Sequence, residues 1–177
     1  MSARIHKALF PLLRRMSDGR FHSGQALAHE FNLSRSSIFN ALAQAESMGL
    51  TIHAVRGRGY RMPEPVEWLD GDAVAQHLGA TADAYTIHIL DSVDSTNTVL
   101  MAAALNGAAD GTLICTEHQQ SGKGRRGRQW HSVLGGSLTF SVLWRFENGL
   151  QSLSGLSLAV GLGLARAGDR HSRHPVG

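Results

Sequence analysis

The 177-residue sequence has only one cysteine and no long apolar run, and each of these absences excludes a class of protein. It contains a single cysteine, Cys115, which excludes a disulfide scaffold and a cysteine-rich zinc site. No apolar run reaches the roughly 18 residues of a membrane-spanning helix. The apolar pattern near the N-terminus is broken by Arg14 and Arg15, unlike that of a secretory signal. We therefore expect a soluble, cytoplasmic protein that does not bind membranes.

Basic residues are also missing from a long stretch of the chain. Residues 63–120 contain no Lys or Arg, whereas residues 1–62 carry nine Lys and Arg against three Asp and Glu, a net charge of +6. Four cations then fall within six positions, at Lys123, Arg125, Arg126 and Arg128. Charge sorted in this way predicts a nucleic-acid partner for the first region and a small anionic ligand for the later cluster. Solvated surface charge is the alternative interpretation.

The basic first region has the pattern of a winged helix-turn-helix domain. Its apolar spacing predicts a helix over residues 5–16, although Pro11 would delay the start. Ser23 is expected to cap a short second helix, and Ser34 a third. Two short strands joined by the basic turn at residues 56–59 would then form the wing.

Several side chains of this domain are candidates for DNA contact. The third helix offers polar groups near its N-terminal end, where a recognition helix meets base edges. The wing offers arginines for phosphates. The candidates are Arg35, Ser36, Ser37 and Asn40 on the helix and Arg56 and Arg58 on the wing. A protein-interaction module with the same three-helix core is the alternative.

The proline pair at Pro63-Glu64-Pro65 predicts a stiff linker before a second region. Beyond it, helices and strands intermix without a regular βαβ alternation, which predicts an α+β fold with a mixed or antiparallel sheet. The expected helices cover residues 71–78, 98–105 and 155–165, and the expected strands cover residues 85–90, 112–117 and 138–145. We expect the last helix to pack on the sheet.

Two segments of the second region carry candidate chemistry. The first, residues 94–97, has short polar side chains that would cap a helix or bind the hydrogen-bonding edge of a small ligand. The second, residues 119–130, alternates glycines with cations, so that backbone N–H groups and guanidinium forks can surround an anion. It is not a Walker A loop, because Gly124 follows Lys123. A solvated basic loop and a short Arg/Gly RNA-binding segment are the alternatives.

Taken in this order, the motifs resemble those of the bifunctional biotin–protein ligase and biotin operon repressor family, from about Leu9 to Ala165. The motifs that carry the resemblance are Gly19–Gly24, Gly57–Tyr60, Pro63–Pro65, Asp94–Asn97, Gly122–Trp130 and Trp144-Arg145. The resemblance implies a winged helix-turn-helix DNA-binding domain over residues 1–62, a linker over 63–68, the N-terminal part of a biotin ligase catalytic domain over 69–165, and an atypical tail over 166–177.

The resemblance also implies an activity. Members of this family join biotin to ATP, with Mg²⁺, to give biotinyl-5′-AMP, and then transfer biotin to a lysine of biotin carboxyl carrier protein. The adenylate-bound homodimer binds operator DNA and represses biotin synthesis. The residues so assigned to biotin and the adenylate are Ser95, Thr96, Asn97, Gln119, Gly122, Lys123, Gly124, Arg125 and Trp130, with Arg125 and Arg126 as catalytic cations and no metal ligands.

Two features depart from the family pattern. Lys123 stands where arginine is commonest, which keeps the charge but loses bidentate hydrogen bonding. After Ala165 the expected continuation with a Lys-Trp-Pro-Asn-Asp-like strand is missing, so we expect a C-terminally truncated and catalytically impaired chain with an open sheet edge. Its exposed apolar residues would include Leu153, Leu156, Leu158 and Val160. An operator-binding winged-helix module with an inactive ligase remnant is the first alternative, and a lipoate-ligase-like relative is the second.

Overall fold

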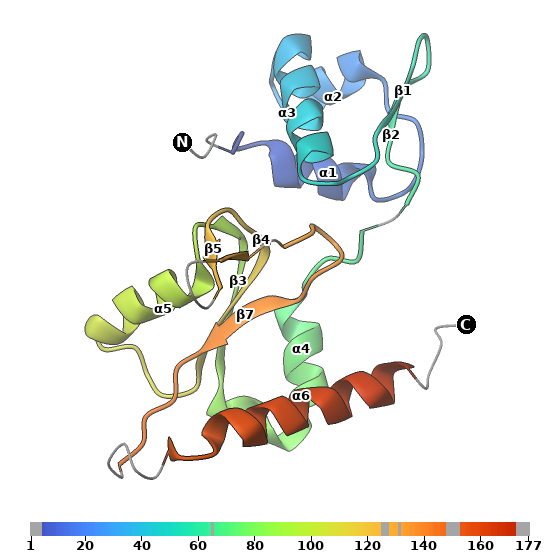
Figure 1. Ribbon diagram of the computed structural model, residues 1–177. Helices are drawn as coiled ribbons and strands as arrows, with labels where there is room; N and C mark the ends of the chain where they lie inside the picture. Colours follow the sequence, from blue (N-terminus) through green and yellow to red (C-terminus); the bar gives the residue numbers. More distant parts are fainter. Residues whose placement is uncertain (1–4, 65, 125–127, 131, 148–152, 173–177) are drawn as a thin grey trace. The chain divides into compact units, whose positions relative to one another are not determined.

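The computed structural model describes residues 5–64, 66–124, 128–130, 132–147 and 153–172 (Figure 1). The chain divides into two compact units, residues 1–144 and residues 145–177. The first unit holds a winged helix-turn-helix followed by a mixed sheet, and the second holds one long helix. This confirms the predicted α+β class. Within the described ranges, no helix combines the length and the apolar character that crossing a membrane requires.

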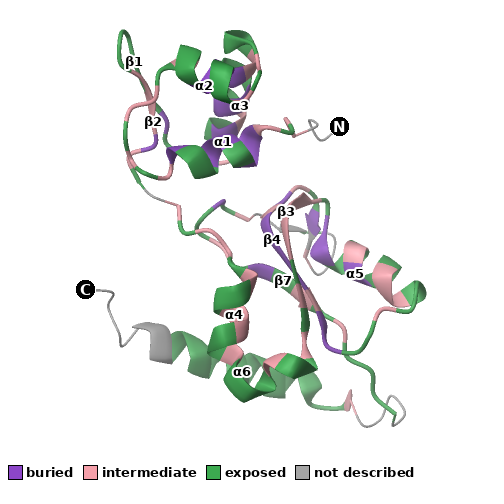
Figure 2. Cartoon of the chain, turned by 180° about the vertical axis from the view of Figure 1, so that it is seen from behind, coloured by how far each residue is buried: buried purple, intermediate pink, exposed green. Residues whose placement is uncertain are grey.

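Three helices and a two-stranded ribbon form the winged helix-turn-helix. They are α1 (Leu9–Met16), α2 (Gly24–Glu30), α3 (Arg35–Ser47), β1 (His53–Val55) and β2 (Gly59–Arg61), the two strands being antiparallel. α1 begins later than the predicted residue 5, because Pro11 then lies in the first turn, where its missing N–H breaks no helical hydrogen bond. Buried side chains line α1 and the inner side of α3 (Figure 2).

Side-chain caps set the starts of α2 and α3, as the sequence predicts. Ser23 Oγ accepts the Ala26 N–H at 3.0 Å. Ser34 Oγ accepts the Ser37 N–H, also at 3.0 Å. Each bond satisfies one of the backbone donors that a helix leaves unpaired at its first turn. The two caps therefore fix the angle at which the chain enters each helix.

The wing is anchored to the segment that precedes α2. The His22 N–H donates to the Tyr60 carbonyl at 2.8 Å, and the Tyr60 N–H donates back to the His22 carbonyl at 2.9 Å. Gly59, which precedes Tyr60 in β2, has a φ of +101°. A Cβ at this position would collide with the His22 carbonyl oxygen. Only glycine combines this backbone conformation with so close an approach.

The sheet of the second region has three strands in the order β3-β4-β7. β3 (Thr86–Val93) runs parallel to β4 (Thr112–Gln119), which pairs with β7 (Thr139–Val142) in antiparallel register. α4 (Gly71–Leu78), with the 3₁₀ turn η1 (Gly79–Ala84), precedes the sheet, and α5 (Thr96–Leu105) connects β3 to β4. The sheet is therefore mixed, as predicted. α5 packs against β4 and β7.

Element ends differ from the prediction at several places. β3 and β4 run two or three residues further than expected, and α5 starts at Thr96, because Ser95 acts as its N-cap. β7 is shorter than the predicted 138–145. The basic loop contains a short hairpin of β5 (Gly122–Lys123) and β6 (Gln129–Trp130), which the sequence analysis did not predict.

α6 (Leu156–Ser172) differs most from the prediction. We expected a helix over 155–165 that packs on the sheet, but the helix continues to Ser172, and residues 154–169 are all exposed. The continuation is physically reasonable, because residues 165–172 contain no proline. Leu156, Leu158 and Val160 are exposed as predicted, with Leu158 78% exposed, whereas Leu153 is half-buried. The prediction that this helix packs on the sheet stays a prediction, because α6 and the sheet belong to different units.

Candidate functional site

Polar side chains of the second region converge where the parallel strands β3 and β4 end. Val93 and Gln119 are paired at these two ends, and α5 begins three residues after Val93. The carboxyl ends of parallel strands are the usual ligand-binding edge of such sheets. The positive end of the α5 dipole lies at the same place.

Thr96, Gln119 and Ser141 form a hydrogen-bonded cluster at the ends of β3 and β4. The Thr96 N–H donates to Gln119 Oε1 at 2.8 Å, and Thr96 Oγ1 lies 3.3 Å from the same oxygen. Thr96 Oγ1 also lies 2.8 Å from Ser141 Oγ on β7. Thr96 and Gln119 are both buried. Because the Gln119 oxygen is engaged by Thr96, its Nε2 amide is oriented and has no hydrogen-bond acceptor among the described residues.

Two neighbouring candidates differ in their surroundings. Ser95 is buried, and its Oγ caps α5 by accepting the Thr98 N–H at 3.5 Å, a long bond. Asn97 is exposed. The structure thus brings Ser95 and Thr96 to the cluster with Gln119 and leaves the Asn97 side chain at the surface.

The basic loop begins directly beside this cluster. The Ser121 N–H donates to the Asp94 carbonyl, and the Gln120 N–H to the Val93 carbonyl, each at 2.9 Å. The Gly124 N–H donates to the Arg128 carbonyl at 2.7 Å and extends the hairpin that begins at Gly122. The predicted catalytic residues Arg125 and Arg126 lie outside the described residues, as do the side chains of Lys123 and Trp130.

Two serines at this place were not predicted. Ser132 Oγ accepts the Gln119 N–H at 3.0 Å, and Ser141 meets Thr96 as described above. A single serine in a strand or loop has no distinctive sequence pattern, and each of these finds its partner through the tertiary fold. Both help to fix the orientation of the candidate ligand-binding groups.

Burial shifts the pKa of three side chains on β4, raising that of the Cys115 thiol and changing those of Glu117 and His118. Burial raises the pKa of the Glu117 carboxyl and outweighs the hydrogen bond from the Leu69 N–H, at 2.8 Å, which acts in the opposite direction. Burial also lowers the pKa of His118, whose Nδ1 has no partner within the described structure. All three shifts favour the uncharged form, as expected for side chains taken out of water.

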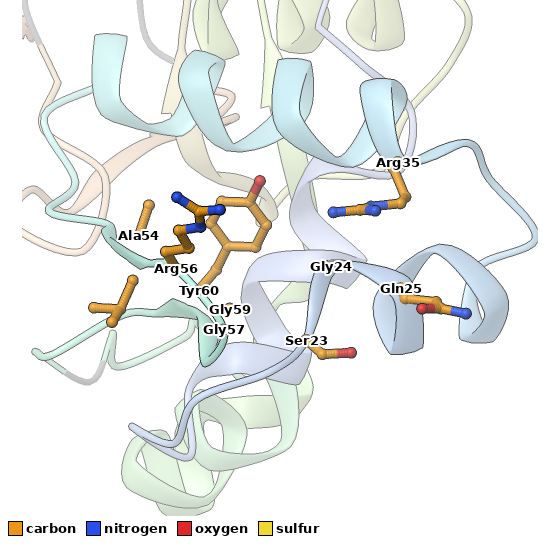
Figure 3. Close-up of a pocket in the computed structure, with 10 residues that line it drawn as sticks. Ser23, Gly24, Gln25, Arg35, Ala54, Arg56, Gly57, Gly59 and Tyr60 are labelled. Atoms are coloured by element: carbon orange, nitrogen blue, oxygen red, sulfur yellow. The ribbon is translucent and has the colours of Figure 1, made fainter.

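A second candidate site lies in the winged helix-turn-helix, where a hollow of about 470 Å³ opens between the wing and the starts of α2 and α3. In Figure 3 the Arg35 side chain extends from the start of α3 toward the Tyr60 ring, and the Arg56 guanidinium group appears at the other edge of that ring. No acidic residue lines the hollow, and neither arginine has an ion-pair partner within the described ranges. The hollow is therefore suited to an anion.

The other predicted DNA contacts are placed less uniformly. Asn40 is exposed on α3, but the hydroxyls of Ser36 and Ser37 each lie 2.8 Å from Ser34 Oγ and so take part in the helix cap. Arg58 lies on the wing, beside an aromatic ring rather than in the hollow. Residues that line the hollow and were not predicted are Ser23, Gln25 and Tyr60. Phe39, which is 58% exposed on α3, was also missed.

Comparisons with protein families match both parts of the chain. The HTH domain family matches residues 11–61. The biotin/lipoate A/B protein ligase family matches residues 89–171, which extends beyond Ala165, where the predicted resemblance ends. The first match contains the residues that line the hollow, and the second contains the Thr96–Gln119 cluster.

Curated proteins are similar to this chain over most of its length or over half of it. The "Bifunctional ligase/repressor BirA" of Salmonella typhimurium is 36% identical over 154 residues, which cover 87% of this chain and 47% of that protein. The protein of the same name from Bacillus subtilis is 26% identical over 168 residues, covering 94% and 51%. The "Biotin--[acetyl-CoA-carboxylase] ligase" of Mycobacterium tuberculosis is 36% identical over 89 residues, covering 49% and 34%. The chain thus spans about half the length of the first two relatives.

Proposed function

Because this chain belongs to the bifunctional biotin–protein ligase and biotin operon repressor family, we propose that it binds biotin and ATP at the Thr96–Gln119 cluster and operator DNA through its winged helix. The first activity would activate biotin for transfer to biotin carboxyl carrier protein. The second would repress biotin synthesis. A protein that serves both the carrier and the chromosome would work in the cytoplasm.

The proposed reaction has two steps. A carboxylate oxygen of biotin attacks the α-phosphorus of ATP, the bond from that phosphorus to the pyrophosphate oxygen breaks, and biotinyl-5′-AMP forms. The uncharged ε-amine of the carrier lysine then attacks the acyl carbon, an amide forms and AMP leaves. The first step brings two anions together, and the cations of the basic loop, Lys123, Arg125 and Arg126, would offset the repulsion and stabilise the developing charge.

The oriented Gln119 amide carries the proposal for biotin. Its oxygen is fixed by the Thr96 N–H, which leaves Nε2 to donate to an oxygen of biotin. Ser95 and Asn97 at the start of α5, and Gly122, Gly124 and Trp130 of the basic loop, would complete the site. Mg²⁺ would arrive with the phosphates of ATP, and we assign it no ligand on the protein, since no group of three acidic, His or Cys side chains stands together in the described structure.

Isothermal titration of the chain with biotin in the presence of ATP tests this proposal. We expect saturable heat for the unsubstituted chain. Thr96→Val keeps the side-chain shape but removes the hydroxyl that contacts Gln119 and Ser141, and we expect biotin binding about tenfold weaker, the scale of one lost buried hydrogen bond. Thr98→Val, at an exposed position of the same helix whose hydroxyl contacts neither Gln119 nor Ser141 in the described structure, is the matched control. No heat at millimolar biotin would exclude the ligase proposal for this chain.

DNA binding is proposed from Arg35 and Arg56, which both line the hollow. A phosphate there would meet two cations and no acidic side chain of the lining, while Ser36, Ser37 and Asn40 belong to the same helix α3 as Arg35. We expect Arg56→Gln to lower the salt dependence of binding to the biotin-gene promoter by about 0.9 in the log–log slope. Arg35→Ala should reduce the preference for that promoter over unrelated DNA. Binding that is indifferent to sequence would contradict specific repression.

Homodimerisation in the adenylate-bound state is the proposed link between the two sites. Two winged helices on a two-fold operator would bind better than one, so a ligand that favours the dimer also favours repression. Sedimentation of the chain with and without biotin plus ATP tests this link. A mass that stays constant would contradict it.

The second candidate function is an operator-binding module whose ligase region is inactive. It is favoured by the contrast between the buried core of the winged helix and the exposed Met101, Leu105 and Leu138 of the second region. Promoter binding without any heat from biotin and ATP would select this second function. Competition with lipoate in the same titration would identify a lipoate-ligase-like specificity.

A further inference from the structure

We propose that Phe21 is a positioning residue of the DNA interface: its ring orders Arg58 and Arg61 of the wing as a pair of cations for backbone phosphates. This inference rests on the proposed DNA binding and extends it to two residues, Phe21 and Arg61, that lie outside the hollow. It concerns the duplex backbone rather than base reading.

The geometry places both arginines on one ring. Arg58 Cζ lies 4.2 Å from the centroid of the Phe21 ring, and Arg61 Cζ lies 5.5 Å from it. Both distances are within the roughly 6 Å over which an aromatic face attracts a guanidinium group. Phe21 precedes His22, which is hydrogen-bonded to Tyr60, so the ring is held beside β2 by the same contacts that anchor the wing.

Contact with the ring leaves the exposed Arg58 able to bind through its N–H groups, and Arg61 through those other than its buried Nε–H. A guanidinium group uses its face against an aromatic ring, whereas its N–H donors point outward along its edge. Arg58 and Arg61 have no ion-pair partner within the described residues. The nearby carboxylate of Asp18 is engaged by the His22 ring at 2.8 Å and by the Arg20 N–H at 2.9 Å.

Two like charges on one ring need a further source of stabilisation, which a polyanion supplies. The Nε atom of Arg61 is buried without a hydrogen-bond partner, so the ring, rather than a hydrogen bond from Nε, constrains this side chain. A long side chain that is ordered in the free protein loses less freedom on binding. The ring would therefore raise DNA affinity without contacting DNA itself.

Binding of the full chain to a generic DNA duplex, measured at several salt concentrations, tests the inference. We expect Phe21→Leu to weaken binding about three- to fivefold, the scale of a cation–π contact, and Phe21→Tyr to bind like the unsubstituted chain. The salt slope should be unchanged in Phe21→Leu, because every charge is kept, whereas Arg58→Gln should lower it by about 0.9. Melting temperatures of all variants report any loss of fold.

A double-substitution cycle separates positioning from general stability. In a background that carries both Arg58→Gln and Arg61→Gln, Phe21→Leu should have no further effect on affinity. An equal loss in that background would overturn the inference, because the ring would then act independently of the arginines. Equal affinity of Phe21→Leu and the unsubstituted chain would overturn it as well.

Side-chain NMR of the free protein tests the contact without DNA. The Arg58 Nε–Hε resonance should show a ring-current shift that Phe21→Leu removes, and absence of that shift would refute the stacking. Failure of the unsubstituted chain to bind any duplex would refute the proposed DNA binding, and the role of the ring with it. Binding that is insensitive to Phe21 would refute the role of the ring alone.

Discussion

Two regions of the chain differ in how far they bury their apolar side chains: the winged helix-turn-helix (residues 5–62) and the region that precedes α6 (residues 69–147, here called the ligase region). Most of the buried apolar residues in the described structure belong to the winged helix, where Leu9, Leu12 and Leu13 are fully buried. Most of the exposed large ones lie in the ligase region and α6, from Met101 to Leu164 (Figure 2). The same chain thus combines a closed core with a sheet and helix that leave apolar surface in contact with water.

The polar contacts of the two regions do not differ in the same way. The winged helix has its caps and its wing anchor in place, and the ligase region has the Thr96–Gln119–Ser141 cluster with normal hydrogen-bond distances. The comparison teaches that hydrogen bonds at strand ends can be complete in a region whose apolar side chains remain exposed. Hydrogen bonds at strand ends need only the neighbouring strands, whereas apolar burial needs a covering layer.

The largest expected effect tests the difference in burial between the two regions through the free energy of unfolding. Leu12→Ala should lower the free energy of unfolding by about 2–5 kcal/mol, because it leaves a cavity in a fully buried position. Leu105→Ala, at a position 87% exposed in the ligase region, should change it by less than about 0.5 kcal/mol. Urea denaturation followed by circular dichroism measures both. Similar losses for the two variants would contradict the contrast in burial.

The next effect concerns the wing anchor. Gly59→Ala should displace the wing from His22, because the new Cβ collides with a backbone carbonyl. Gly57→Ala is the matched control, since its φ of +81° is also positive but nothing lies within 4 Å of its Cβ position. The control should lose only about 1–2 kcal/mol of stability, which is the cost of a strained backbone conformation at this position. Hydrogen exchange of the Tyr60 amide measures the difference, and equal protection in both variants would argue against the close contact.

A smaller effect compares one helix cap from each region. Ser34→Ala should cost about 1 kcal/mol of unfolding free energy, the usual effect of removing an N-cap. Ser95→Ala should cost less, because the Ser95 bond to the Thr98 N–H is 3.5 Å long, against 3.0 Å for the Ser34 bond to the Ser37 N–H. The thermal unfolding midpoints of the two variants give the comparison. A larger loss for Ser95→Ala would show that its cap is the stronger.

The smallest effect is the pH dependence contributed by Glu117. Burial raises its pKa in the folded state, so the folded protein binds this proton more tightly than the unfolded chain. The contribution to stability is therefore present below the unfolded pKa, about 4.3 for glutamate, and is lost as the pH rises through the folded pKa. Glu117→Gln keeps an acceptor for the Leu69 N–H and should be slightly more stable than the unsubstituted chain at pH 7. Thermal unfolding at pH 7 and pH 4 should show that this advantage shrinks in acid.

Local features of the fold were predictable from the sequence, and those that depend on distant partners were not. The caps at Ser23 and Ser34 and the late start of α1 follow from hydrogen bonding within four residues and from the fixed geometry of proline. The β5–β6 hairpin was missed, because a run of glycines and cations has no strand pattern. The packing expected for α6 stays a prediction, because an apolar composition indicates a need for cover but does not identify the surface that provides it.

By itself, the sequence determined the order of the regions, their charges, and the short-range signals that start and stop each helix. Only the tertiary structure decided which polar groups meet: Thr96 lies 23 residues from Gln119 and 45 from Ser141 along the chain. It also brought the Phe21 ring to Arg58 and Arg61, and it placed Arg35 and Arg56 in the lining of one hollow. The physical reason is that capping and periodicity act over one or two turns of backbone, whereas these contacts depend on strand register and on the pairing of segments far apart in the chain.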